Sequence, residues 1–173
     1  ILSGIRVGEA VALSFDDFSN DTAAEIHRTE TRYKKEGKYV FELKDEPKTE
    51  AGYRKIYIPQ EYAWILPELR KLRPFATYLA TNTKGQRMTT NCIRDRLRRV
   101  CRWAGIDQKS PHKTRKTFCS ILLQAGCDPK LVAEAAGHAD CKTTFKYYDY
   151  DRQTDDEKQE MINNIVEFKT AAQ

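Results

Sequence analysis

Apolar residues in the first third of the chain change from helical to strand-like spacing. Residues 1–13 carry apolar side chains at helical spacing, and Gly4 and Gly8 allow a sharp turn where this segment begins. Three alternating runs follow at residues 24–33, 39–43 and 54–58. Their period of two and their β-branched and aromatic residues predict strands, and the glycine-containing breaks between them predict hairpin turns. We therefore expect a small three-stranded antiparallel sheet.

The rest of the chain has the 3.6-residue spacing of amphipathic helices. Helices are predicted at residues 61–72, 90–104, 110–126, 128–136 and 155–169, with a short helix or turn at 142–148. Pro67 is expected to split or kink the first of these, and Thr90 or Asn91 to cap the second. Ser110 before Pro111 is a typical helix start. The predicted fold class is α+β, mostly helical, in one domain of 173 residues.

Charge and cysteine content limit the classes of protein to which this chain can belong. The net charge of +5 permits a nucleic-acid partner, and five arginines fall between Arg94 and Arg102. Five cysteines without a CxxC pair argue against a zinc site or a disulfide framework, so we expect reduced thiols and no metal. The sequence contains no apolar run long enough for a membrane span and no signal peptide, which predicts a cytoplasmic protein.

Candidate chemistry is concentrated between residues 110 and 150. His112 and Arg115 are three positions apart, so both lie on one face of the predicted helix and could reach one anion. His138 follows Gly137, and an adjacent pair of tyrosines, Tyr147 and Tyr148, comes nine and ten positions later. This set of residues suits binding and attack of a phosphodiester by a tyrosine nucleophile.

Each candidate also has a structural interpretation. Arg6 and Glu9 could form an ordinary surface ion pair instead of a phosphate clamp. Lys48 could be a solvated loop lysine, and His138 a helix C-terminal cap. Because adjacent helical residues point in different directions, one of Tyr147 and Tyr148 is expected to lie in the core.

Together these residues resemble the tyrosine recombinase (phage integrase) family over nearly the whole chain. The first motif is Gly-Ile-Arg-Val-Gly-Glu at residues 4–9, and the second is His-Lys-Thr-Arg at 112–115. The closing motifs are Gly137-His138 and the run Thr-Thr-Phe-Lys-Tyr-Tyr at 143–148. The resemblance is greatest to integrases of phages and conjugative transposons. It implies the fold of DNA-breaking and rejoining enzymes, in which the small three-stranded sheet lies on one side of a mostly helical catalytic domain.

The resemblance also implies a role for each site residue. Arg6 and Arg115 would bind the scissile phosphate, and Glu9 would support them. His112 and His138 would supply hydrogen bonds and handle protons. Lys48 would protonate the leaving 5′-oxygen, and Tyr148 would attack to give a 3′-phosphotyrosyl bond, without metal, ATP or another cofactor. We place DNA contacts at four basic residues: Arg94, Arg98, Lys113 and Lys116.

Several alternatives remain open on sequence alone. Tyr147 could replace Tyr148 as the nucleophile. The chain could be a non-catalytic DNA-binding module of the same fold, or a type IB topoisomerase-like enzyme. We expect residues 1–173 to be a single catalytic domain from a longer bacterial protein, without the core-binding and arm-binding domains that usually precede it. The expected partners are double-stranded DNA attachment sites, with four protomers of the full-length protein on two such sites.

Overall fold

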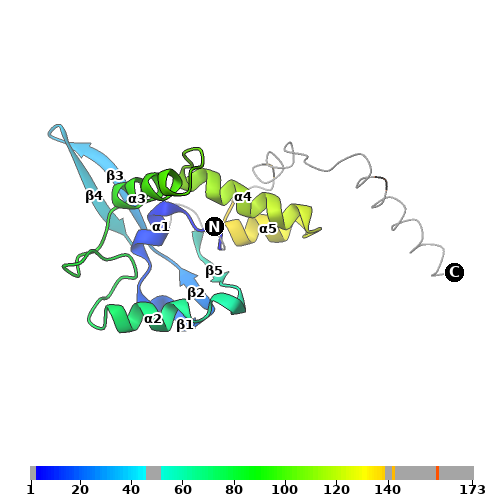
Figure 1. The fold of residues 1–173 in the computed structure, drawn as a ribbon, viewed down its shortest axis with the longest axis horizontal. Helices are drawn as coiled ribbons and strands as arrows, with labels where there is room; N and C mark the ends of the chain where they lie inside the picture. Colours follow the sequence, from blue (N-terminus) through cyan, green and yellow to red (C-terminus); the bar gives the residue numbers. More distant parts are fainter. Residues whose placement is uncertain (1–2, 46–51, 139–141, 143–158, 160–173) are drawn as a thin grey trace.

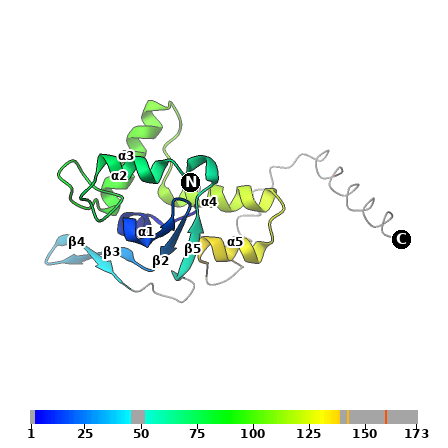
Figure 2. The same cartoon turned by 90° about the horizontal axis from the view of Figure 1, so that it is seen from below.

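The computed structural model describes residues 3–45 and 52–138, together with the single positions Lys142 and Gln159. Lys48, Cys141, Tyr147, Tyr148 and the predicted helix at 155–169 therefore lie outside the described residues. Within these described ranges, five α-helices and five strands are arranged as an α+β fold (Figures 1 and 2). None of the described helices is long and apolar enough to cross a membrane.

The sheet has three antiparallel strands, as expected, but not the expected set. Its order is β1 (Phe18–Asn20), β2 (Ala23–Ile26) and β5 (Arg54–Tyr57). Ile26 pairs with Arg54, and Ala23 pairs with Tyr57. The inner face packs against the end of the first helix, because Ala24, Ile26 and Ile56 form one buried cluster with Leu13.

The predicted strand at residues 24–33 is two strands, because the pairing is interrupted at His27 and Arg28. The Arg28 side chain is bound by Asp17, with a closest distance of 2.6 Å. The second part, β3 (Thr29–Lys35), lies outside this sheet and, among the strands of the described ranges, pairs with β4 (Lys38–Lys44) alone. This two-stranded ribbon projects from the body beside helix α3 (Figure 1).

The ribbon ends in a hairpin turn at the position expected from the sequence. Lys35 pairs with Lys38, so Glu36 and Gly37 are the two turn residues, with φ of 51° and 78°. Two consecutive positive φ values are typical of a type I′ hairpin turn, which matches the twist of the flanking strands.

Four helices lie close to their predicted ranges, and one is shorter. The first, α1 (Val7–Ala12), is short because the chain before it turns sharply at Gly4, whose φ is 58°. A Cβ at Gly4 would lie 2.3 Å from the Phe118 ring. The others are α2 (Ile65–Leu72), α3 (Thr90–Trp103), α4 (Pro111–Gln124) and α5 (Pro129–Ala136).

Helix starts were predicted with mixed success. Ser110 caps α4 as expected, since its hydroxyl accepts from the Lys113 backbone N–H at 3.2 Å. Pro67 lies in the first turn of α2, where it needs no hydrogen-bond partner, and a 3₁₀ turn at Gln60–Tyr62 precedes that helix. At α3 the expected Thr90 or Asn91 cap was wrong: the N-cap residue is Thr89, and the Glu30 carboxylate accepts from the Thr90 N–H at 2.7 Å.

Helix α4 packs against α5 through a cluster of small and apolar side chains. Cys119 and Leu123 of α4 are buried against Val132 and Ala136 of α5. Ile121 of the same helix points away from this cluster and is 53% exposed. Positions 115, 119 and 122 lie within one face of the helix, so Arg115 lies on the buried side instead of the surface. The packing of α4 on α5 therefore buries a guanidinium group.

Candidate active site

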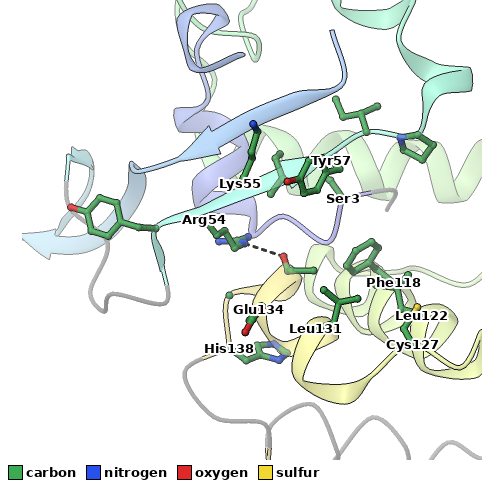
Figure 3. A pocket seen from close by; sticks show the side chains of 16 residues that line it. Ser3, Arg54, Lys55, Tyr57, Phe118, Leu122, Cys127, Leu131, Glu134 and His138 are labelled. Atoms are coloured by element: carbon green, nitrogen blue, oxygen red, sulfur yellow. Dashed lines mark hydrogen bonds between the residues drawn. The ribbon is translucent and has the colours of Figure 1, made fainter. Parts of the chain in front are cut away.

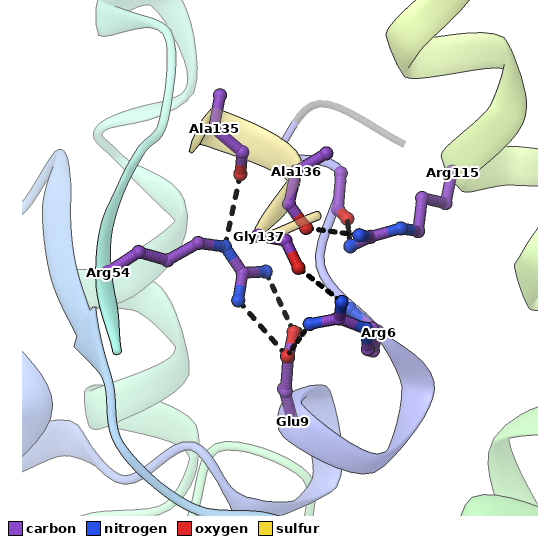
Figure 4. Close-up of polar contacts among 8 residues, drawn as sticks. Arg6, Glu9, Arg54, Arg115, Ala135, Ala136 and Gly137 are labelled. Carbon is purple, nitrogen blue, oxygen red and sulfur yellow. Dashed lines mark hydrogen bonds and ion pairs between the residues drawn. The ribbon is translucent and has the colours of Figure 1, made fainter. Parts of the chain in front are cut away.

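Three arginines converge on the last turn of α5, where helix carbonyls lack partners within the helix. The Arg54 Nε donates to the Ala135 carbonyl at 3.1 Å. Arg115 Nη2 donates to the next carbonyl, that of Ala136, and Arg6 Nη2 to that of Gly137 (Figure 4). The partial negative charge at a helix C-terminus stabilises these cations. The three consecutive carbonyls thus place three guanidinium groups side by side.

Arg6 and Arg115, which the sequence assigns to one phosphate site, come from opposite parts of the chain. Arg115 also donates from Nη1 to the Gly4 carbonyl at 2.7 Å, which fixes the segment that leads into Arg6. Arg115 is 4% exposed, whereas the Arg6 side chain is 42% exposed. Burial, and then the charge of Arg6, lower the pKa of Arg115 to about 10, so the group stays positive at neutral pH. Arg6 and Arg115 are therefore two adjacent cations, and Arg6 is the one that faces solvent.

Glu9 is the single acidic group bound to this cluster among the described residues, and it is 4% exposed. One carboxylate oxygen accepts from the Arg6 backbone N–H at 2.8 Å, and the other from Arg6 Nη1 at 2.7 Å. Arg54 binds both oxygens, at 3.0 and 2.8 Å. Burial alone would raise the pKa of Glu9, but the hydrogen bonds and charges of Arg54 and Arg6 hold it below its ordinary value. Glu9 therefore remains ionised and fixes both arginines.

Arg54 was missed in the sequence, although a signal was present. It lies at the start of β5, and its side chain is 7% exposed. In the alternation of β5, Arg54 shares a face with Ile56, which is 4% exposed. An arginine on the buried face of a strand needs a buried anion, and Glu9 supplies it. The alternation could have marked Arg54, but not its partner.

His138 follows α5 directly, and its backbone N–H donates to the Ala133 carbonyl at 2.8 Å. Its side chain is half-buried. Burial, followed by the charges of Arg115, Arg6 and Arg54, lowers its pKa to about 4. His112 is the next contributor to that shift, from the exposed first turn of α4. The imidazole of His138 is therefore neutral at physiological pH, so it can donate or accept a hydrogen bond.

A cleft of about 760 Å³ opens beside these groups, between β5 and the helices α4 and α5. Arg54 and His138 line its polar end (Figure 3). Phe118, Leu122 and Leu131 line its apolar part. The cleft therefore reaches the cluster through Arg54 and His138, while Arg6 and Arg115 are not part of its lining.

The remaining candidate residues are placed as follows. Lys113 is exposed on α4, and Lys116 of the same helix is half-buried. Arg94 and Arg98 lie on α3, with Arg98 exposed. Among the residues that the structure describes, Arg6, Glu9, Arg115 and His138 gather at one end of α5, which no single sequence motif could show. His112 lies near enough for its charge to lower the pKa of His138.

Comparison with known proteins gives consistent matches. The phage integrase family matches residues 1–154. Tyrosine recombinase XerC of Thermodesulfovibrio yellowstonii is 32% identical over 146 residues, which are 84% of this chain and 46% of that protein. The chain therefore spans about half the length of this curated relative.

Solved structures share the fold. The Tn1549 transposon integrase in complex with transposon right end DNA superposes with a TM-score of 0.76 at 23% identity, over 95% of this chain and 56% of that chain. XerA recombinase superposes with a TM-score of 0.70 at 22% identity, over 94% of this chain and 54% of that chain. The α+β fold is therefore that of these recombinases.

Proposed function

Since the chain belongs to the phage integrase family, we propose that it is the catalytic part of a site-specific DNA recombinase. The observation that carries the proposal is the pair of guanidinium groups of Arg6 and Arg115 on the adjacent carbonyls of Gly137 and Ala136. Two fixed cations beside a neutral histidine suit a phosphodiester, whose charge increases in the transition state. The substrate is double-stranded DNA in the bacterial cytoplasm.

In the proposed reaction, a tyrosine hydroxyl attacks the scissile phosphorus and passes its proton to one of the site histidines. The bond between phosphorus and the 5′-oxygen breaks as the bond to the tyrosine oxygen forms, which leaves a 3′-phosphotyrosyl link. The energy of the phosphodiester is kept in that link, so a second strand with a free 5′-hydroxyl can reverse the step. Tyr148 is the proposed nucleophile, and Lys48 the proposed acid that protonates the leaving oxygen.

The described residues have distinct roles in this scheme. Arg6 and Arg115 hold the non-bridging oxygens and stabilise the additional charge of the pentacoordinate state. His112 and His138 donate hydrogen bonds to the same oxygens and relay protons. Glu9 keeps Arg6 in position through its two hydrogen bonds, of 2.7 and 2.8 Å.

Trapping the covalent intermediate tests the proposal. The full-length protein is incubated with a nicked suicide substrate of its attachment site, and any adduct is mapped by mass spectrometry. We expect an adduct on Tyr148 that Tyr148→Phe abolishes and Tyr147→Phe retains. An adduct on Tyr147 would replace the nucleophile. No adduct would favour a DNA-binding module without chemistry, and relaxation of supercoils without strand exchange would favour a topoisomerase-like enzyme.

We also propose that four protomers act on two DNA sites, with DNA contacts from Arg94, Arg98, Lys113 and Lys116. Deletion of the residues after Asp151, which include the amphipathic sequence at 155–169, should prevent assembly of the tetramer on DNA. Unchanged tetramer formation in native gels would contradict that role for the segment.

A further inference from the structure

A second basic site lies between the β3–β4 ribbon and helix α3. It is a cleft of about 400 Å³ lined by Arg32 of β3 and by four residues of α3. These four are Asn91, Arg94, Asp95 and Arg98. The charged groups of its lining are therefore three guanidinium groups and one carboxylate, and that carboxylate is already paired with Arg98 at 3.0 Å.

The other two arginines share a neutral acceptor. Arg32 Nη1 donates to Asn91 Oδ1 at 3.4 Å, and Arg94 Nη1 donates to the same oxygen at 3.1 Å. Two like charges held at one amide oxygen repel each other, since an amide carries no charge to offset them. A bound anion would remove that cost, and the guanidinium fork fits two phosphate oxygens.

The arrangement is held by neighbouring contacts. The Arg32 guanidinium lies over the Tyr39 ring at 4.4 Å, and Lys34 lies over the same ring at 5.4 Å. At the base of the ribbon, buried Glu30 binds both Arg87 and the first turn of α3. Helix α1, which begins after Arg6, packs against β3 and α3. The cleft is therefore fixed relative to the candidate active site.

We propose that this cleft is a second phosphate-binding site, in which Arg32 and Arg94 together hold one phosphate of the DNA backbone. The projecting ribbon then acts as an arm that grips duplex DNA away from the reacting phosphate. The inference rests on the proposed function for the identity of the polymer. It adds Arg32 of the ribbon as a DNA contact and pairs Arg32 with Arg94 on one phosphate.

Salt dependence of DNA binding tests this site. Binding of a fluorescent duplex of random sequence to the full-length Tyr148→Phe protein is measured across a range of KCl concentrations. Arg32→Gln and Arg94→Gln should each weaken binding and reduce the slope of log K against log salt by about 0.9, the value for one phosphate contact. The double variant should lose about the same 0.9, because both side chains hold the same phosphate.

Two controls make the result specific. Lys71→Gln removes an exposed cation from α2, which lies across the molecule from the ribbon, and should leave the slope unchanged (Figure 1). Tyr39→Phe should bind like the parent, whereas Tyr39→Leu should bind more weakly because Arg32 loses its ring contact. Unfolding curves of each variant establish that the fold is retained.

The outcomes separate this inference from the proposed function. Unchanged slopes for both arginine variants, an equal loss in Lys71→Gln, or a doubled loss in the double variant would overturn the shared phosphate site. The suicide-substrate experiment reports chemistry independently. An adduct with unchanged slopes would reject the site alone, and reduced slopes without an adduct would reject the proposed reaction alone.

Discussion

Glu9 has two arginine partners, and Arg54 is the more buried of them. Arg54→Met would leave Glu9 with Arg6 alone and the Ala135 carbonyl without its donor. Removing one partner of a buried ion pair is costly because the remaining charge stays desolvated. We expect a loss of about 3 kcal/mol in the free energy of unfolding, measured by urea denaturation.

The adjacent residue of the same strand provides the control. Lys55 is exposed, and Lys55→Met removes an equal charge from β5. Its effect should stay within about 0.5 kcal/mol, as for most surface substitutions. Equal losses in the two variants would mean that the pairing of Arg54 with Glu9 adds no stability.

His138 is expected to titrate far below an ordinary histidine. Its pKa is lowered to about 4 by burial and then by the charges of Arg115, Arg6, Arg54 and His112. The unfolded chain binds this proton near pH 6.5, so stability is retained above that pH and is lost as the pH falls toward 4. NMR titration of the imidazole should give a midpoint near 4 in the folded protein and near 6.5 in urea. A folded midpoint at or above 6.5 would contradict the burial of His138 among these cations.

At the scale of elements, the start of α3 depends on a residue from the ribbon. The Glu30 side chain is fully buried, binds Arg87 and accepts from the Thr90 N–H at 2.7 Å. Glu30→Gln keeps the shape but removes the charge, and hydrogen bonds to charged groups contribute about 2 kcal/mol. We expect a stability loss of that size and faster hydrogen exchange in the first turn of α3.

Glu42→Gln on the exposed part of β4 is the matched control and should change neither quantity. Slow exchange at Thr90 in Glu30→Gln would show that α3 begins without help from the ribbon.

Local sequence patterns predicted where helices and turns lie better than they predicted the long-range contacts of these elements. The Ser110-Pro111 start of α4 and the Glu36-Gly37 turn were predicted because neighbouring residues determine them. The cap of α3 was not, since it depends on Glu30, whose contacts are 57 and 60 residues away in sequence. The charge of Glu30 gave no sign that it would be buried.

At the scale of the whole molecule, the candidate site exists only in the complete fold. Arg115 binds the Gly4 carbonyl across 111 positions, and Arg6 binds the Gly137 carbonyl across 131. The motifs predicted that Arg6, His112, Arg115 and His138 lie in one site, because proteins that share a family's motifs are expected to share the arrangement of those residues in space. Arg54 lies outside those motifs, so only the folded structure could show its contact with Glu9.

This dependence predicts that DNA stabilises the entire domain. The cluster holds three guanidinium groups, two of which bind the Glu9 carboxylate, and the mutual repulsion of these cations is relieved when phosphate binds. A ligand that binds only the folded state adds about 2.7 kcal/mol at a concentration 100 times its Kd. Duplex DNA should therefore raise the Tm, and the increase in Tm should become smaller as salt rises because phosphate contacts are screened.

A variant of Arg115 tests whether the cluster is engaged. Lysine in place of Arg115 cannot bind both the Gly4 and Ala136 carbonyls as a planar fork. The increase in Tm on DNA binding should therefore be smaller in Arg115→Lys than in Lys71→Gln. Equal increases in the two variants at every salt concentration would show that DNA binds without engaging the arginine cluster.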